Sequence, residues 1–243
     1  RLTARDISLA AAMGYDRLSV RRRPVVAMLA TGDELVAPGA TPSAGQIVSS
    51  IPDGLAGLIE AAGGKPHPLG IARDTLQSLD RYLARGAGAD VLVTIGGASV
   101  GEHDLVQQAL AARGLDLAFW KIAMRPGKPL MFGRLGAQRV LGLPGNQVSA
   151  FLCAEIFLKP LIAALLGRPP AARAMQRMRL AGAIEATGPR AHYMRAETVA
   201  AEGDLRVRAL DSQDSSLIAT LARADCLIVR PSHSPALEAG GEV

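Results

Sequence analysis

Residues 24–35, PVVAMLATGDEL, begin with an unbroken apolar run that ends in Gly-Asp-Glu. An apolar run without polar alternation is typical of a strand that is buried on both faces of a sheet. A second run of this kind, DVLVTI at residues 90–95, leads into Gly96 and Gly97. We therefore predict two central strands with glycine-rich turns after them.

Helical segments separate the strand candidates along the first two thirds of the chain. Apolar residues recur at helical spacing in 7–14, 52–62, 74–85, 104–113 and 146–159, and the last helix is expected to kink or stop before Pro160. Further strand candidates are 65–72, whose prolines favour a sheet edge, and 117–123, 130–132 and 139–143. Alternating strands and helices predict an α/β fold with a three-layer, mainly parallel sheet.

The character of the sequence changes after residue 168. Residues 171–243 contain short, Arg-rich alternating segments, such as QRMRLAGAI, HYMRAETV and CLIVRP, broken by Gly, Pro and Asp. This pattern predicts a small antiparallel β domain with one helix or turn near 216–221. We expect the Arg side chains of 168–208 to form the polar face of its strands, and His192 to lie at the surface.

Composition narrows the possible functions. The chain has 243 residues, a net charge of +5 and only 3% aromatic residues, and no dense Lys/Arg block indicates nucleic-acid binding. Cys153 and Cys226 lie far apart in apolar runs, which favours buried thiols in a reducing, cytoplasmic compartment. No His or Cys spacing suits zinc. We find no signal peptide, and the apolar run near 150–166 carries charges and Pro160, so we expect a core helix.

Five loops are expected at the carboxyl ends of the strands, where α/β sheets bind ligands. Their glycines let a ligand approach the backbone closely and can aim N–H groups at it. A helix N-terminus near Asn146 and Ser149 favours a bound anion. The loops are TGDEL (31–35), RD (73–74), GGASVGEHD (96–104), MRPGKP (124–129) and GLPGNQVSA (142–150).

One rim of the sheet would therefore carry acids, cations and glycine loops together. Carboxylates beside phosphate-binding loops are a usual way to hold Mg²⁺. Arg125 and Lys128 stand at the two ends of a Pro-Gly turn, where they repel each other unless an anion lies between them. The combination favours metal-assisted displacement at a phosphoryl group. Taken singly, each Asp at a helix start has a commoner role as an N-cap.

The five loops, in this order, resemble those of the molybdopterin molybdenumtransferase family, which includes bacterial MoeA and the E domains of plant Cnx and gephyrin. The family motifs TGDEL, GGVSVGxxD, KPGKP and GLPGNPVS are matched here by TGDEL, GGASVGEHD, MRPGKP and GLPGNQVSA. The match continues more weakly through GPRAHYMR and DSQDSSLIATLARADCLIV. The resemblance implies a molybdopterin-binding, MogA-like α/β domain at 23–170, a C-terminal β-barrel domain at 171–243, and a remnant of a connecting segment at 1–22.

The resemblance also implies a reaction and its residues. Adenylated molybdopterin and molybdate would be the substrates, and Mg²⁺-dependent cleavage would release AMP. The resemblance implies that the catalytic and metal-binding acids are Glu34, Asp74 and Asp104, and that Lys121 is a catalytic basic residue. The cofactor would be bound by the glycine loops and the helix start, at Gly96, Gly97, Ser99, Gly101, Gly145 and Asn146. The molybdate oxyanion would be held by Arg125, Lys128, Ser149, Arg190 and Ser215.

Three departures from the family motifs stand out. The family's DSN or DTN is here Ser49-Ser50-Ile51, GNPVS has become GNQVS with Gln147, and KPGK has become RPGK with Arg125. The family's two N-terminal domains, which help to build its homodimer, are missing from a chain that begins at Arg1 rather than Met. As given, the chain could bind ligand without turning over.

Two other functions stay open. A MogA-type adenylyltransferase, which in the family's pathway acts upstream, shares the α/β domain and would load AMP onto molybdopterin; the C-terminal domain and the MRPGKP loop favour the insertase. A non-catalytic, gephyrin-like scaffold would need no acids at the rim, so Glu34, Asp74 and Asp104 argue against it.

Overall fold

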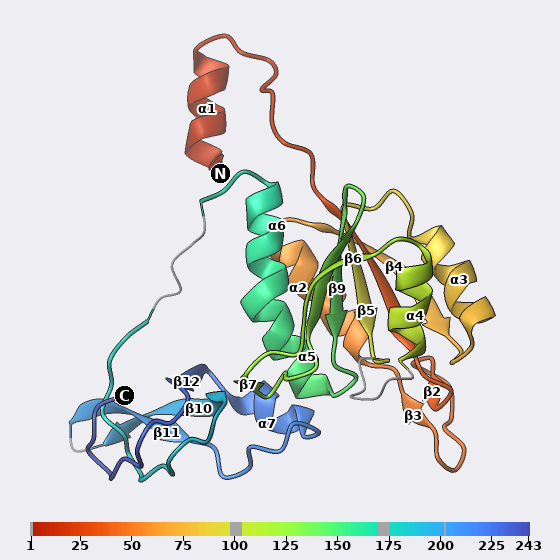
Figure 1. Ribbon diagram of the computed structural model, residues 1–243. Coiled ribbons are helices and arrows are strands. Elements are labelled where there is room, and N and C mark those ends of the chain that lie inside the picture. Colours follow the sequence, from red (N-terminus) through yellow and green to blue (C-terminus); the bar gives the residue numbers. More distant parts are fainter. Residues whose placement is uncertain (1, 98–103, 170–174, 202) are drawn as a thin grey trace.

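The computed structural model describes residues 2–97, 104–169, 175–201 and 203–243. Three parts are visible in Figure 1: an α/β domain, a small β domain beside the lower edge of its sheet, and an N-terminal helix that stands apart. The predicted division at residue 170 falls beside residues outside the described ranges, and it stays a prediction.

The α/β domain is built on a six-stranded sheet with the order β4-β1-β5-β9-β8-β6. These strands are β1 Val25–Thr31, β4 Lys65–Ala72, β5 Val91–Ile95, β6 Asp116–Trp120, β8 Met131–Leu135 and β9 Gln138–Leu143. The strands β4, β1, β5 and β9 pair in parallel, whereas β8 and β6 are antiparallel. The mainly parallel sheet is confirmed, and so is the edge position of the proline-containing strand β4. A separate two-stranded parallel ribbon contains β2 Leu35–Val36 and β3 Ile47–Val48.

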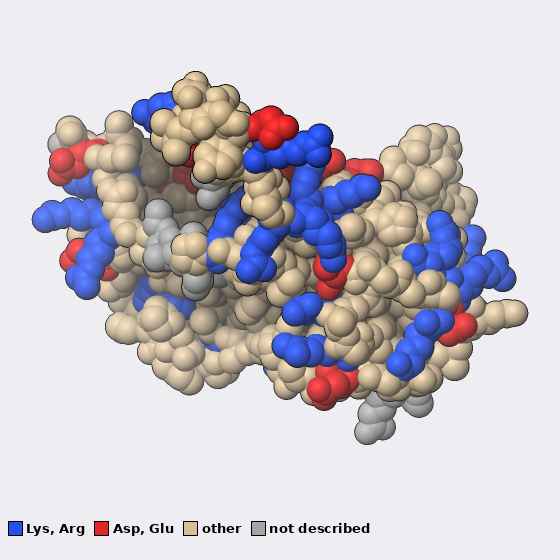
Figure 2. Space-filling view, turned by 90° about the horizontal axis from the view of Figure 1, so that it is seen from above, with Lys and Arg blue, Asp and Glu red and all other residues tan. Residues whose placement is uncertain are grey.

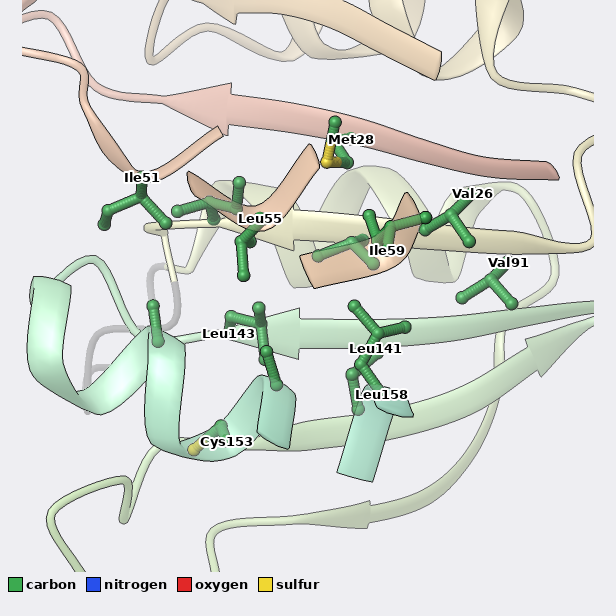
Figure 3. Close-up of a cluster of buried hydrophobic side chains, with 14 of the residues drawn as sticks. Val26, Met28, Ile51, Leu55, Ile59, Val91, Leu141, Leu143, Cys153 and Leu158 are labelled. Carbon is green, nitrogen blue, oxygen red and sulfur yellow. The ribbon is translucent and has the colours of Figure 1, made fainter. Parts of the chain in front are cut away.

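Helices cover both faces of the sheet, which gives the predicted three layers. One face carries α2 Ile51–Ala62, α5 Gln147–Cys153 and α6 Lys159–Leu165, and the other carries α3 Leu76–Arg85 and α4 Leu105–Ala112. The strand β1 serves both sides, because Val26 and Met28 contact one core and Ala27 and Leu29 the other. In Figure 3 the side chains of α2 fill the space between β1 and the α5–α6 helix. Each fully buried aliphatic side chain of this kind contributes about 1.5–3 kcal/mol.

The long helix over this core was expected to kink or stop before Pro160, and it does not stop. It passes from α5 through a π-helical turn, Ala154–Leu158, into α6. The N–H of Lys159 donates to the carbonyl of Ala154, five residues back. Proline lacks the N–H that an α-helix would need, and the wider turn lets the chain continue.

The same helix, Gln147–Leu165, is long and apolar enough to cross a membrane by those criteria alone. Here it covers the sheet, with Leu158 and Ile162 fully buried. It is therefore a core helix of the α/β domain, as predicted.

The C-terminal domain contains β10 Ala191–Ala201, β11 Asp204–Ala209, β12 Cys226–Arg230 and the helix α7 Ile218–Arg223. The strand β10 pairs antiparallel with both β11 and β12, so the small antiparallel β domain is confirmed. The segment QRMRLAGAI makes only isolated bridges, such as Leu180 with Val207, instead of a strand. A two-residue strand of the α/β domain, β7 Met124–Arg125, adds to β10 in parallel and joins the two domains.

The N-terminal helix α1, Ala4–Ala12, begins three residues before the predicted start at residue 7. A reciprocal capping box explains the early start, because Thr3 and Asp6 each bond the other's backbone N–H. Gly14 follows the helix with φ +85°, as predicted for the C′ position. No residue of α1 is buried.

Candidate functional site

A cleft of about 440 Å³ opens at the carboxyl edge of the parallel strands. The loops after β1, β5 and β9 and the starts of α2 and α5 form its walls. Its lining includes most of the predicted glycines and two of the predicted acids: Thr31, Gly32, Glu34, Ser49, Ser50, Ile51, Asp74, Gly96, Gly97, Pro129, Gly145, Asn146 and Gln147.

The glycines of this cleft sit where side chains do not fit. Gly96 has φ +89°, and a Cβ added there would lie 2.7 Å from the carbonyl oxygen of Thr31. Gly97 has φ +65°, and its Cβ would lie 2.3 Å from the Val106 side chain. A Cβ on Gly145 would lie 3.3 Å from the Cα of Gly96, so the two glycine loops touch. The predicted Ser99 and Gly101 lie outside the described residues.

Two helices begin at the wall of the cleft. The helix α2 starts after Ser50 and α5 starts after Asn146, and neither N-cap side chain bonds a backbone N–H. The buried Oδ1 atom of Asn146 has no hydrogen-bond partner within the described residues. The first-turn N–H groups and the helix dipole make both starts favourable places for an anion, although at α5 the Val148 N–H already donates to the Ser215 carbonyl.

Asp74 is not the N-cap of the following helix, a role that the sequence had left open. Thr75 caps α3 instead, since its hydroxyl accepts a hydrogen bond from the Ser78 N–H. The Asp74 N–H donates to Oδ1 of Asp33 at 3.3 Å. Partial desolvation, followed by the charges of Asp33 and Glu34, raises the pKa of Asp74. Its carboxylate thus faces like charges in the cleft and does not cap α3.

Asp104 has a structural role as the N-cap of α4. Its Oδ1 accepts hydrogen bonds from the N–H groups of Val106 and Gln107 at 2.9 and 3.0 Å, which caps α4. Burial raises its pKa, the two hydrogen bonds oppose this shift, and the charge of Asp74 adds to it. Asp104 therefore lies close enough to Asp74 for their charges to interact, although it does not line the cleft.

The predicted set of three metal-binding acids is not assembled as a closed metal centre. Among the residues that the structure describes, no group of three or more His, Cys, Asp or Glu side chains is placed to hold a metal ion. Mg²⁺ commonly takes only one or two carboxylates and completes its shell with phosphate oxygens and water. Glu34 and Asp74, which share the cleft, satisfy that smaller requirement.

The predicted basic residues take different positions. Lys121 has φ +67°, and its Nζ lies 3.9 Å from the centre of the Trp120 ring. Lys128 is exposed in the turn after β7, where its carbonyl accepts from the Ile122 N–H. Arg125, which precedes a cis peptide bond to Pro126, turns toward the C-terminal domain and not toward the acids.

A second, smaller hollow of about 100 Å³ lies where the two domains meet. Arg125, Arg190 and His192 line it together with residues 186–189. Ser149 is buried in the first turn of α5, and the carbonyl of Ser215 accepts from the neighbouring Val148 N–H at 3.2 Å. The acids and arginines that were expected at a single rim thus line two separate hollows, one with acids and one with arginines.

Two residues differ from their expected surface positions. His192 is half-buried, and its Nε2 atom is buried without a partner in the described part of the chain. Arg195 is fully buried, because its guanidinium donates to the carbonyls of Ser212 and Asp214 in a loop that folds over β10. No local signal in the sequence marks that burial, since it depends on a loop nearly twenty positions away.

Two of the departures from the family motifs meet in the cleft. The side-chain amide of Gln147 donates to the hydroxyl of Ser50 at 2.7 Å. Ile51 is only 7% exposed and belongs to the core beneath α2, so it contributes packing. The hydrogen bond between Gln147 and Ser50 joins the starts of α2 and α5.

Figure 2 shows Lys and Arg side chains in several separate groups, with Asp and Glu among them, on the face seen from above. This face has no continuous basic stripe of the kind that tracks a nucleic-acid backbone. Most of the predicted glycines and two of the predicted acids instead line the cleft at the carboxyl edge of the sheet.

The fold and the cleft define an α/β ligand-binding domain followed by a small β domain, and comparisons with known proteins agree. Residues 27–164 match the family model described as a probable molybdopterin binding domain, and residues 177–243 match the MoeA C-terminal region, domain IV. The chain belongs to the MoeA family of molybdenum cofactor biosynthesis.

Curated relatives carry the name molybdopterin molybdenumtransferase. The one from Haemophilus influenzae is 33% identical over 250 residues, which span 100% of this chain and 61% of that protein. The one from Bacillus subtilis is 31% identical over 100% of this chain and 57% of that protein. A crystal structure of the molybdopterin biosynthesis MoeA protein from Pyrococcus horikosii superimposes with a TM-score of 0.83 at 28% identity, covering 100% of this chain and 59% of that one. The chain thus spans about three fifths of the length of these relatives.

Proposed function

We propose that this chain carries the insertion site of a molybdopterin molybdenumtransferase. Molybdate would be placed on the dithiolene sulfurs of adenylated molybdopterin, and AMP would be released. The observation that supports this most is the cleft in which Glu34 and Asp74 stand beside touching glycine loops and two helix starts. A site of this composition suits a phosphorylated ligand together with a divalent cation.

The acids fit a magnesium ion. The pKa of Asp74 is raised partly by the neighbouring charges of Asp33 and Glu34, a repulsion that a divalent cation would relieve. Glu34 and Asp74 would hold the ion, and Asp104 would support them through its charge while it caps α4. When bound, Mg²⁺ supplies charge neutralisation at the pyrophosphate oxygens.

The chain's own residues would position the pyrophosphate. Gly96, Gly97 and Gly145 leave the backbone open to a ligand, and the starts of α2 and α5 place N–H groups and dipoles nearby. The unpartnered Oδ1 of Asn146 would accept a hydrogen bond from the ligand. Ser99, Gly101 and Lys121 stay predictions from the resemblance.

Molybdate would bind in the basic hollow where the two domains meet. Arg125 comes from the α/β domain and Arg190 from the β domain, so an oxyanion there would be held from both sides. The resemblance also implies Lys128, Ser149 and Ser215, which do not line this hollow. A charge-assisted hydrogen bond from an Arg is about twice as strong as a neutral one.

The compartment, oligomeric state and upstream enzyme that we propose are those that the family resemblance implies. The protein would act in the cytoplasm, as a homodimer in its full length, and would receive adenylated molybdopterin from a MogA-type adenylyltransferase. The match of residues 177–243 to domain IV favours the insertase over an adenylyltransferase, since the latter function needs only the α/β domain.

The test separates these functions. The chain is incubated with adenylated molybdopterin and molybdate, with and without Mg²⁺, and AMP release is measured; a parallel reaction contains molybdopterin and Mg-ATP. We expect AMP release only in the first reaction, and only with Mg²⁺. ATP-dependent loading of AMP in the second would establish the adenylyltransferase instead. If neither reaction proceeds and calorimetry detects no binding of molybdate or Mg²⁺, a scaffold role follows.

A further inference from the structure

Three strands bring basic residues into one row across the junction of the two domains. In the sheet register, His192 of β10 pairs with Arg125 of β7 on one side and with Arg230 of β12 on the other. Residues that are directly paired across strands point to the same face of the sheet. The side chains of Arg125, His192 and Arg230 therefore lie on one face of the sheet, and Arg190, in the turn before β10, lines the same hollow as Arg125 and His192.

The basic side chains of this row lack hydrogen-bond partners within the described residues. The Nε2 atom of His192 and the Nη1 atom of Arg230 are both buried, and neither has a partner there. Arg230 is only 3% exposed, and its other contact is with the carbonyl of Pro235. No ion pair is formed by Arg125, Arg190, His192 or Arg230 within the described ranges. Buried donors without acceptors cost free energy unless a ligand satisfies them.

The hollow in front of the row has the size of a small anion. Its volume of about 100 Å³ corresponds to roughly three water molecules at about 30 Å³ each, which is enough for a central atom with four oxygens. The nearby Thr187 hydroxyl is already committed, since it donates to the Pro231 carbonyl and accepts from the Ser234 N–H. Arg125, Arg190 and His192 therefore supply the side-chain donors of the hollow.

We propose that His192 is a donor of this oxyanion hollow and takes up one proton when a tetrahedral dianion binds between it, Arg125 and Arg190. The proposal rests on the molybdate subsite of the proposed function and adds a coupling between anion binding and protonation. Affinity then rises as the pH falls below neutrality, which makes the insertion step sensitive to pH.

The charges around His192 explain the coupling. Burial, then Arg125, Arg195, Arg190 and Arg230, lowers the pKa of His192 to about 4, so the imidazole is neutral near pH 7. Every charged group that acts on it from β7, β10 and β12 is an arginine. A dianion cancels these positive charges and attracts the imidazolium, so the bound state favours the protonated form. Because proton uptake and anion binding are thermodynamically linked, lower pH strengthens the binding of the anion, by up to about tenfold per pH unit.

The test uses sulfate as the probe, because its charge does not change between pH 8 and pH 5. Sulfate affinity is measured by calorimetry at pH 8, 7 and 6 in two buffers of different ionisation enthalpy, which counts the protons taken up. The His192 imidazole is followed by NMR with and without sulfate. The variant His192→Gln keeps a hydrogen-bond donor but cannot titrate, and His67→Gln, on the exposed edge strand β4, is the matched control.

We expect wild type and His67→Gln to bind sulfate several-fold more tightly at pH 6 than at pH 8, with proton uptake and a raised His192 pKa. His192→Gln should bind with the same affinity at both pH values. Sulfate binding without proton uptake would overturn the role of His192 and leave the molybdate subsite standing. If neither sulfate nor molybdate binds to wild type at any pH, this inference and the proposed molybdate subsite both fail, whereas Mg²⁺-dependent binding at the cleft would be unaffected.

Discussion

Among single residues, the two acids at helix starts differ in role. Asp104 caps α4 through Oδ1, whereas Thr75 and not Asp74 caps α3. The sequence placed both acids at helix starts and could not separate these roles. Thr75, one residue after Asp74, is the N-cap of α3, so its side chain and not that of Asp74 accepts the hydrogen bond from the backbone.

Asp104→Ala should destabilise the protein by about 1 kcal/mol, because the N-cap acceptor of α4 is lost. Asp104→Asn keeps an acceptor at the same place and should change stability much less. Chemical denaturation of both variants checks this. If Asp104→Asn also abolishes Mg²⁺-dependent AMP release, the charge has a role beyond the cap; unchanged release would limit Asp104 to capping.

Asp74→Asn should slightly stabilise the protein at pH 7 and remove Mg²⁺-dependent AMP release. The pKa of Asp74 is raised in the folded chain, so its ionised form opposes folding above the unfolded pKa. This penalty disappears as the pH falls below the unfolded value and both states become protonated. Melting temperatures at pH 7 and pH 3.5 should therefore differ from wild type only at pH 7, by up to about 2 °C. A variant that is less stable at pH 7 would contradict the repulsion described for Asp33, Glu34 and Asp74.

At the scale of elements, the sequence predicted the parallel sheet well, because buried strands and amphipathic helices carry local signals. It identified the edge strand β4 from its prolines and the close glycine turns after β5 and β9. Of the kink or stop expected before Pro160, the stop does not occur, and a π-helical turn precedes the proline instead. The strand expected in QRMRLAGAI, residues 176–184, is replaced by isolated bridges. Both outcomes depend on the packing around the segment, which carries no local signal in the sequence.

Gly96→Ala tests the close approach of the glycine loops. Gly88→Ala is the matched control, since Gly88 has φ +84° with open space around it, while Gly96 has φ +89° and faces the Thr31 carbonyl. Both variants carry backbone strain of about 1–2 kcal/mol, and Gly96→Ala should lose clearly more stability because the backbone must also move. Equal losses of unfolding free energy would show that the loop after β5 has room to adjust.

At the scale of the whole molecule, the site exists only because two domains share a sheet edge. The strand β7 leaves the α/β domain to pair with β10, and this places Arg125 opposite His192. This pairing could not be predicted from the sequence, because a two-residue strand has no periodicity. The sequence analysis therefore grouped all the charged loops into one pocket, although the acids and the arginines line separate hollows.

Arg125→Ala and Arg190→Ala should each raise the molybdate concentration for half-maximal response by about ten- to a hundredfold. The double variant should lose less than the sum of the two, because both arginines hold the same anion. Lys128→Ala, whose side chain does not line the hollow, should have a smaller effect. Additive losses, or an equal loss for Lys128→Ala, would show that the oxyanion site is not the one described.

The hydrogen bond between Gln147 and Ser50 has a consequence for how such sequences change over time. The Gln147 amide relies on the Ser50 hydroxyl as its acceptor, whereas the hydroxyl also stands beside the proline that the family motif has at position 147. We expect the dependence to run one way, so that relatives with an amide at 147 keep a hydroxyl at 50. Natural variation would then record a contact that neither position reveals by itself.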